Sequence, residues 1–384
     1  MTDGSRRTTV TAPGDRRLEA PHRRGGASPR VVERTAVLAY RVTARVIAAL
    51  PPRFAASVLG RLAQLSYLAW PTKRRWVDRN FAHVLGVSPA DRRVRRLALK
   101  AYAEYGRYLT ELMRLPTRPV EEVRTLVPDL DVDGVRRLWR ETPGGGGLIL
   151  VVGHVGSNEA VAAAVAGHGL PISVVADDSS FPELFDLLRR QREQWGVTIV
   201  GWRNLRAIFG VLRRREVLGL LVDWGYRSDG IPVRFFDGWT AFPAGPATLA
   251  AKTGSRILPV TIRRQPDDTF HVAFQTPIDL ASDEPAELQR ATQAIADALA
   301  STIGAAPEQW YSFKPLWPAT ADEAADLERR AGVMLAGQPD PGPGRGFEPP
   351  PPPGAAPKPA PAASSDPTPH AAPATDRTEG EALT

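Results

Sequence analysis

The sequence predicts a layered α/β/α sandwich with a mostly parallel, mixed sheet, preceded by a helical N-terminal region. From residue 141 onwards, short apolar runs alternate with helical segments, which is typical of a sheet with helices on both faces. Upstream of that point, apolar side chains recur at helical spacing, with a stripe of Tyr and Leu side chains over 102–113. We therefore expect a helical region over 31–140 and an α/β core over 141–336.

The α/β core begins at four consecutive glycines, which are followed by the apolar run LILVV. A short run of this kind predicts a strand buried on both faces, as in a parallel sheet. Further strands are expected over 171–177, 197–200 and 216–223, separated by helices over 157–168, 181–195 and 204–214. The segment IPVRFF, a helix near 245–253, the strands RILPVTIRR and TFHVAFQ, and a helix over 285–300 complete the core.

The two ends of the chain have compositions that predict disorder. Residues 1–30 carry seven Arg against three acidic residues and contain no apolar run, so they predict a basic arm rather than a secretory signal. The tail over 337–384 is rich in Pro, Ala and Gly, and its last 46 residues include 14 Pro. Such a segment buries too little apolar surface to offset the entropy lost on ordering.

The segment 36–70 is rich in Leu, Ala and Val, but four Arg side chains interrupt it and Pro51 and Pro52 divide it into two helices. It is therefore not a spanning helix, which needs about 20 apolar residues. Tyr67 and Trp70 near its end favour helices that lie in a membrane interface, with aromatic rings at headgroup depth. An ordinary helix pair packed on the core fits the same pattern, and both interpretations stay open.

Composition excludes several classes of chemistry. Because Cys is absent, a thiol nucleophile, a Cys-ligated metal, an iron–sulfur cluster and disulfides are all ruled out. The chain shows no phosphate-binding GxxxxGK[ST] loop, no HExxH motif and no GxSxG elbow, and we predict no metal site. The formal charge of +7 is carried mainly by Arg, which favours an anionic partner. With no recognisable nucleic-acid-binding module, we expect no nucleic-acid partner.

Polar residues stand where two predicted strands end, which is the edge at which α/β sheets bind ligands. His154 ends the LILVVG strand, and Asp223 ends the VLGLLV strand. Glu159 follows His154 in GHVGSNE, where a turn would fold its carboxylate back onto the imidazole to make a general base. Gly153 and Gly156 would leave room for a substrate near the backbone. A buried His bonded to a carbonyl, with Glu159 as a first-turn helix acid, is the alternative.

Two other groups of charged residues are candidates for ligand binding. In FPELFDLLRRQREQW, Arg189 and Arg192 lie along the inward stripe of the predicted helix, whereas Arg190 points outward. An inward Arg pair is costly unless it meets an anion, although Arg stems can also pack while their heads reach water. Asp177 and Asp178 end a strand and could hold a metal in a glycosyltransferase, or form an ordinary turn.

The segment GHVGSNE matches the H-x4-[D/E] arrangement of glycerolipid and lipid A acyltransferases. Around it, five segments resemble, in order, those of the lipid A biosynthesis late acyltransferase family of the lysophospholipid acyltransferase-like superfamily. That family includes the phosphatidylinositol mannoside acyltransferases of actinobacteria. The segments are RNFAHVLG (79–86), AYAEYGRYLTELMRLP (101–116), FPELFDLLRRQREQWGVTIV (181–200), LLVDWGYRSDGIPVRFFDGWTAFPAGPATLAAKTGSRILPV (220–260) and QWYSFKPLWP (309–318).

The resemblance implies an acyltransferase that moves a fatty acyl chain from acyl-CoA or acyl carrier protein to a hydroxyl of a membrane glycolipid or phospholipid, with a phosphatidylinositol mannoside as a candidate. It implies that His154 is the general base and Glu159 its partner, with no covalent enzyme intermediate and no cofactor beyond the acyl co-substrate. The supporting or substrate-binding residues would be Asp223, Arg189, Arg192 and Arg227, the Arg pair holding a phosphate of the lipid or of CoA.

Because the substrates would be lipids, we expect peripheral attachment to an anionic membrane surface, on the cytoplasmic face of the plasma membrane. The 36–70 helices would supply apolar surface, and the basic segment 73–100 would supply cations. Two other functions remain possible at this point: a noncatalytic lipid-binding or membrane-scaffold protein with the same fold, and a membrane-associated glycosyltransferase.

Overall fold

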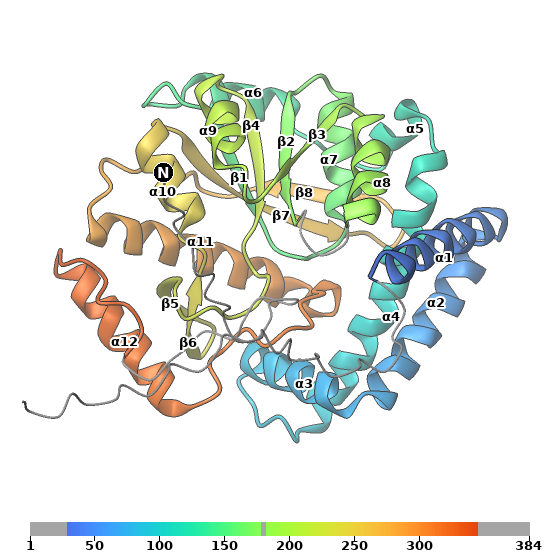
Figure 1. The fold of residues 1–384 in the computed structure, drawn as a ribbon, viewed down its shortest axis with the longest axis horizontal. Helices are drawn as coiled ribbons and strands as arrows, with labels where there is room; N and C mark the ends of the chain where they lie inside the picture. Colours follow the sequence, from blue (N-terminus) through green and yellow to red (C-terminus); the bar gives the residue numbers. More distant parts are fainter. Residues whose placement is uncertain (1–28, 178–181, 345–384) are drawn as a thin grey trace, which may run out of the picture. The chain divides into compact units, whose positions relative to one another are not determined.

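The computed structural model describes residues 29–177 and 182–344, and these residues contain a six-stranded sheet (Figure 1). Its strands are β1 (Leu148–Val152), β2 (Ile172–Ala176), β3 (Val197–Gly201), β4 (Val217–Leu221), β7 (Arg256–Arg264) and β8 (Phe270–Phe274). Their order across the sheet is β3-β2-β4-β1-β7-β8, and every neighbouring pair is parallel except β7 and β8. The predicted mostly parallel, mixed sheet is therefore confirmed.

Helices cover both faces of this sheet (Figure 1). One face packs against α9 (Leu205–Arg213), α10 (Gly245–Thr253) and α11 (Pro285–Ala305), and the other against α6 (Val132–Arg140) and α7 (Asn158–Gly167). The helix α5 (Val120–Thr125) packs on α7. The helix α8 (Pro182–Glu193) lies along β3. Because side chains alternate along a strand, Ile149 and Val151 of β1 enter the first layer, whereas Leu148 and Leu150 enter the second.

The N-terminal region is helical, as predicted. It consists of α1 (Pro29–Ala49), α2 (Pro52–Ala69), α3 (Pro71–Leu85) and α4 (Arg92–Arg114), followed by the 3-10 turn η1 (Leu115–Thr117). The predicted break at Pro51 and Pro52 is confirmed, since α1 ends just before them and α2 begins at the second. Tyr67 and Tyr102 bury one side of these helices in the main core. Within the described ranges, no helix combines the length and apolar character that crossing a bilayer requires.

One strand and one helix were not predicted from the sequence. The strand is β6 (Gly238–Phe242), which pairs with β5 (Ile231–Phe235), the segment IPVRFF, in an antiparallel hairpin outside the main sheet. The helix α12 (Ala321–Leu335) packs on that hairpin. A short 3-10 turn, η2 (Pro307–Gln309), follows α11.

The buried Arg330 ties α12 to the loop that precedes the hairpin. Its guanidinium donates to the carbonyl oxygens of Ser228 and Gly230 and forms a bidentate ion pair with Asp340. Asp340 lies in the segment predicted to start the disordered tail. Apart from residues 29–30 and 337–344, the predicted arm and tail lie outside the described residues.

The crossing of α2 and α4 depends on a contact between two glycines. A Cβ added at Gly106 would stand 2.2 Å from the backbone nitrogen of Gly60 and 2.4 Å from its Cα. Real Cβ contacts are far longer, so any side chain at Gly106 must push the two helices apart. The close approach of these helices is therefore set by the absence of a side chain.

We predict that Gly106→Ala lowers the free energy of unfolding by about 1–3 kcal/mol, which is the usual cost of overpacking a core. Gly332→Ala, in α12, is the matched control because a Cβ there meets no atom within 4 Å. The control should be stabilised by roughly 0.5–1 kcal/mol, since alanine loses less backbone entropy than glycine on folding. Chemical denaturation of both variants measures the difference, and equal midpoints would show that the helices do not depend on this contact.

Candidate functional site

The site is built where β1 and β4 end side by side. These strands are parallel neighbours with Val152 opposite Leu221, so the residues that follow them emerge at one edge of the sheet. The imidazole Nδ1 of His154 lies 2.6 Å from Asp223 Oδ1. The backbone N–H of His154 donates to the two oxygens of the same carboxylate, at 2.9 and 3.1 Å. The structure thus brings together the two residues that end these strands.

Asp223 is fully buried, and its carboxylate is held by several donors. Besides His154, the indole Nε1 of Trp310 donates to Oδ2 at 2.8 Å, and Ser312 Oγ donates to the backbone oxygen of Asp223 at 2.9 Å. Burial alone would raise the pKa of Asp223, but the charge and hydrogen bonds of His154 and the bond from Trp310 outweigh it and lower the pKa. The carboxylate is therefore ionised at neutral pH.

An ionised carboxylate can only accept hydrogen bonds, so it selects one tautomer of the neutral imidazole. His154 must carry its proton on Nδ1 and donate it to Asp223, which leaves the lone pair of Nε2 free. Burial alone would lower the pKa of His154, but the charge of Asp223 and its hydrogen bond outweigh burial and raise it. With 24% of its side chain exposed, His154 stays accessible to a substrate.

The glycines beside His154 serve the protein's own packing. A Cβ at Gly153 would lie 2.6 Å from Leu299 Cδ1 and 3.1 Å from Asp223 Oδ2. Gly156 has a left-handed φ of +66°, and a Cβ there would lie 2.8 Å from the side chain of Ile262. The expectation that these positions leave room for a substrate is therefore wrong: Leu299, Asp223 and Ile262 occupy the space.

Glu159 lies in the first turn of α7 and makes different contacts from those the sequence suggested. Its Oε2 accepts from the hydroxyl of Tyr108 at 3.0 Å, and its Oε1 pairs with Arg192 at 3.0 Å. The carboxylate on His154 Nδ1 is that of Asp223, because α7 starts directly after Ser157 and carries Glu159 towards α4 and α8. The negative charge of Glu159 still contributes to raising the pKa of His154, after the larger effects of burial and of Asp223.

The other predicted Arg residues are paired with acidic side chains. On α8, Arg189 bonds to Asp186 and Glu193, and Arg190 is exposed as expected. Arg227 is 64% exposed and pairs with Asp229 at the surface. Of the three predicted binding arginines, Arg192 is the one that pairs with Glu159, and its side chain is 22% exposed.

Sequence reasoning missed two residues here: Trp224, which lies beside His154, and Lys314, which lies over the ring of Trp224. The ring of Trp224, which follows Asp223, lies 5.4 Å from the imidazole and is 57% exposed. The ammonium of Lys314 lies 3.7 Å from the centroid of the same indole. Lys314 belongs to QWYSFKPLWP, a segment singled out for its resemblance, but its long separation in sequence gives no sign that it contacts Trp224.

The segment that carries Trp310, Ser312 and Lys314 is fixed by one buried amide. Asn80, in α3, donates through Nδ2 to the carbonyl oxygens of Ser312 at 3.1 Å and Lys314 at 2.7 Å. Its Oδ1 accepts from the backbone N–H of Leu316 at 3.2 Å. Asn80 therefore plays the part that a neighbouring strand would play for this stretch of irregular backbone.

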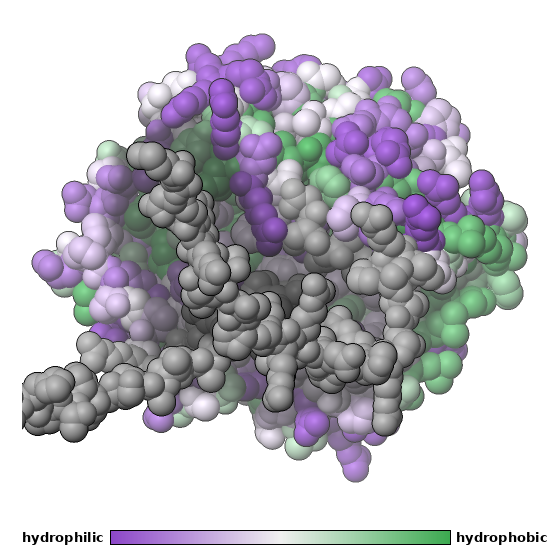
Figure 2. Space-filling model, viewed as in Figure 1, coloured by the Kyte–Doolittle hydropathy of each residue, from purple (hydrophilic) through white to green (hydrophobic). Residues whose placement is uncertain are grey.

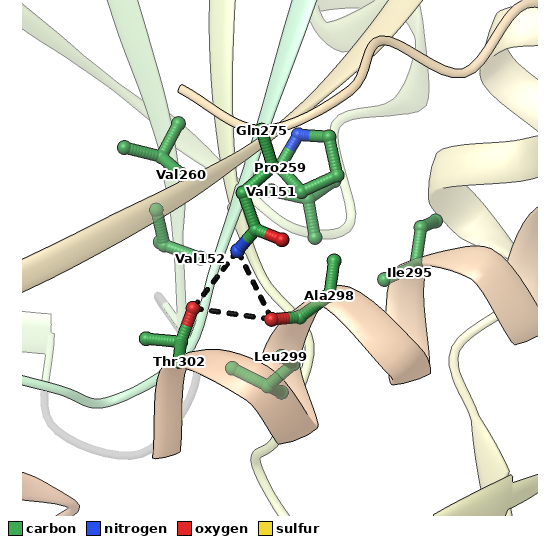
Figure 3. Close-up of a pocket in the computed structure, with 9 residues that line it drawn as sticks. All are labelled: Val151, Val152, Pro259, Val260, Gln275, Ile295, Ala298, Leu299 and Thr302. Carbon is green, nitrogen blue, oxygen red and sulfur yellow. Dashed lines mark hydrogen bonds between the residues drawn. The ribbon is translucent and has the colours of Figure 1, made fainter. Parts of the chain in front are cut away.

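Two hollows in the described residues are lined by side chains other than His154. A cavity of about 10 Å³ between β1, β7 and α11 is shown in Figure 3, where Gln275 donates to Thr302 Oγ1 and to the carbonyl of Ala298, both at 3.0 Å. This volume suits about one water molecule and is too small for an acyl chain. A larger hollow of about 500 Å³ is lined by β2, β3 and α9, including Ser173 and Asn204.

Only one residue of the predicted Asp177–Asp178 pair lies within the described residues. Asp177 is the last described residue after β2, and Asp178 lies outside the described residues. In the part of the chain that is described, no group of three or more His, Asp or Glu side chains gathers in a way that could hold a metal ion.

Comparison with known proteins gives a consistent result. The profile of the family described as bacterial lipid A biosynthesis acyltransferase matches residues 27–319. A phosphatidylinositol mannoside acyltransferase of Mycolicibacterium smegmatis is 29% identical over 299 residues, which cover 77% of this chain and 94% of that protein. Proteins of the same name from two strains of Mycobacterium tuberculosis are 30% identical over 264 residues, covering 66% of this chain and 80% of theirs. With its family profile matched across most of its length, the chain belongs to the bacterial lipid A biosynthesis acyltransferase family.

Proposed function

We propose that this protein transfers a fatty acyl chain from acyl-CoA or acyl carrier protein to a hydroxyl of a membrane glycolipid or phospholipid. The observation that carries this proposal is the His154–Asp223 pair, a general base with a fixed tautomer at the ligand-binding edge of the sheet. Phosphatidylinositol mannosides are the first acceptors to test, because the curated relatives are named for acting on them.

The proposed reaction needs no covalent enzyme intermediate. His154 Nε2 takes the proton of the acceptor hydroxyl while the hydroxyl oxygen attacks the thioester carbonyl carbon, and the π electrons of the carbonyl move onto its oxygen. The imidazolium formed is stabilised by Asp223, which stays ionised. When the C=O bond re-forms, the C–S bond breaks and the thiolate leaves with the proton held by His154. The products are the ester and the free thiol.

Arg192 and Glu159 border this site as an ion pair and are proposed to bind the acceptor. A phosphate entering beside Arg192 would compete with Glu159 for its guanidinium, and Tyr108 would keep the displaced carboxylate hydrogen-bonded. We retain Arg189 and Arg227 as secondary candidates, although each already pairs with acidic side chains at the surface.

Substitutions in the site should separate the base from its surroundings. His154→Ala should lower kcat by about 10²–10⁴-fold, since the proton acceptor is gone. Asp223→Asn should lose a comparable factor, because an amide no longer selects the tautomer or stabilises the imidazolium. Glu159→Gln, the matched carboxylate-to-amide control, should lose much less, since it does not contact Nδ1. Incorporation of radiolabelled palmitate from palmitoyl-CoA into a lipid extract measures all three, and near-wild-type turnover by His154→Ala would contradict the mechanism.

The raised pKa of His154 predicts the pH dependence of activity. A base with a raised pKa keeps its proton to higher pH, so kcat/KM should fall on acidification with a midpoint above the ordinary value of 6.5. NMR titration of the His154 ring protons, assigned with His154→Gln, should give the same midpoint. In Asp223→Asn the midpoint should move to lower pH, because burial then acts without the compensating charge. A wild-type midpoint below 6.5 would refute this assignment of the pair.

We further propose that the protein attaches peripherally to the cytoplasmic leaflet through an α1–α2 apolar face. This face consists of side chains that are 37–61% exposed: Leu38, Val42, Val46, Phe54, Val58, Leu62, Leu65, Leu68 and Trp70. Figure 2 shows hydrophobic residues gathered over these helices, on the right of the view. Four exposed Arg side chains flank the face: Arg41, Arg45, Arg53 and Arg61. Apolar surface next to cations suits an anionic bilayer.

The test of this attachment is sedimentation with vesicles of phosphatidylcholine and phosphatidylglycerol. Raised salt should weaken binding of the full-length protein without abolishing it, because apolar burial is not screened. The triple variant Phe54→Asp, Leu62→Asp, Leu65→Asp should lose the salt-resistant part. Leu335→Asp, at a 48% exposed position of α12, is the control and should bind like the wild type. Wild-type protein that stays in the supernatant at low salt would refute the proposal.

A further inference from the structure

The site contains a cation that the mechanism above does not use. Lys314 is half-buried, and its ammonium stands 3.7 Å from the centroid of the Trp224 ring. The same ring lies 5.4 Å from the imidazole of His154. One indole therefore lies next to both the base and a positive charge, and it connects Lys314 to the site through a shared ring.

The backbone around Lys314 holds it there. Asn80 bonds to the carbonyl of Lys314, and the backbone N–H of Tyr226 donates to the carbonyl of Pro315 at 2.8 Å. The stem of Lys314 packs on Gly225, where an added Cβ would lie 3.3 Å from Lys314 Cβ and 3.6 Å from its Cδ. The backbone and the stem of Lys314 are thus held against α3 and against the loop that follows Asp223.

The surroundings of this ammonium favour an anionic ligand. Burial lowers the pKa of Lys314, and Asp177 opposes that effect. The charge of Lys314 in turn lowers the pKa of His154, so the two groups are electrostatically coupled. A ring face is a weaker partner for an ammonium than an anionic oxygen, so a negative charge formed nearby would gain more from Lys314 than the ring does.

We propose that Lys314 is a catalytic residue whose ammonium stabilises the oxyanion formed on the thioester carbonyl during acyl transfer. This inference rests on the proposed function. When the acceptor oxygen bonds to the carbonyl carbon, the π pair moves to the carbonyl oxygen and the proton passes to His154; the oxyanion exists until the C–S bond breaks. A fixed positive charge at that point lowers the barrier, because the ammonium is already in place as the negative charge develops.

The phosphates of CoA are the competing source of negative charge. They lie at the far end of the pantetheine arm from the thioester, whereas Lys314 shares a ring contact with the base that acts at the thioester. The reacting oxygen is therefore the ligand that this geometry favours. Loss of the Lys314 charge should lower kcat if the charge acts on this oxygen, and should raise KM for acyl-CoA if it binds the phosphates.

The test compares full-length wild type with Lys314→Met, Lys314→Arg and, as control, Lys252→Met at an exposed position of α10. Acyl transfer from palmitoyl-CoA is measured in detergent. Lys314→Met should lower kcat about 10²-fold or more with little change in KM for palmitoyl-CoA. Lys314→Arg should recover part of the loss, and Lys252→Met should match the wild type. The acidic limb of kcat/KM in Lys314→Met should move to higher pH, because the charge that lowers the pKa of His154 is gone.

Three results would overturn the inference while leaving acyl transfer by the wild type intact. These are an unchanged kcat in Lys314→Met, an unmoved acidic limb, and a raised KM for palmitoyl-CoA that disappears with palmitoyl-N-acetylcysteamine, which has no phosphates. Absence of transfer by both wild type and Lys252→Met would instead refute the proposed function, and this inference with it. Thermal unfolding checks that each variant is folded, and Lys314→Gln replaces the methionine variant if that protein melts early.

Discussion

A single buried carboxylate, that of Asp223, holds the site together. It accepts the ring N–H and the backbone N–H of His154 and the indole N–H of Trp310. An isolated charge at this depth would be too costly to keep ionised. The donors that stabilise it come from the loop after β1 and from the segment after η2, so two stretches far apart in sequence must meet before the carboxylate can be buried.

This requirement explains why the C-terminal segment packs as it does. Tyr311 donates its backbone N–H to the carbonyl of His154 at 2.8 Å, and Gly156 donates to the carbonyl of Gln309 at 3.1 Å. The loop after β1 is thus joined to residues 309–311 by backbone hydrogen bonds like those between two strands. Trp310, fully buried, meets Phe81 of α3 edge-on at 5.8 Å between centroids, which links the helical N-terminal region to the carboxylate.

The N-terminal helices pack on the core and the site with one side and leave the other side exposed. Tyr67 and Phe81 enter the core, and Tyr108 of α4 hydrogen-bonds to Glu159 beside the base. The opposite sides of α1 and α2 leave large apolar side chains exposed. The membrane contact proposed above would use these exposed sides while the buried sides pack on the core, because an amphipathic helix has two different faces.

Local pattern determined much of this protein from its sequence alone. The parallel strands of the core, the helices between them and the break at Pro51 follow from apolar runs, turn residues and the missing N–H of proline, which act over a few residues. The same signals placed His154 and Asp223 at strand ends, where parallel neighbours must bring them to one edge. The helix α12 and the strand β6 were missed, and both are stabilised by contacts with other elements: α12 packs on α11, β5 and β6, and β6 pairs with β5.

The choice of carboxylate for His154 was decided only by the tertiary structure. Glu159 is five residues from His154 and Asp223 is 69, so proximity in sequence favoured the wrong partner for the imidazole. Sheet order reversed that preference, because β4 lies next to β1 and delivers Asp223 directly, whereas α7 turns Glu159 towards Arg192. Lys314 and Asn80 likewise gain their places from contacts between distant segments. Spacing along a chain records what local geometry allows, and only the packed fold determines which distant groups share a buried site.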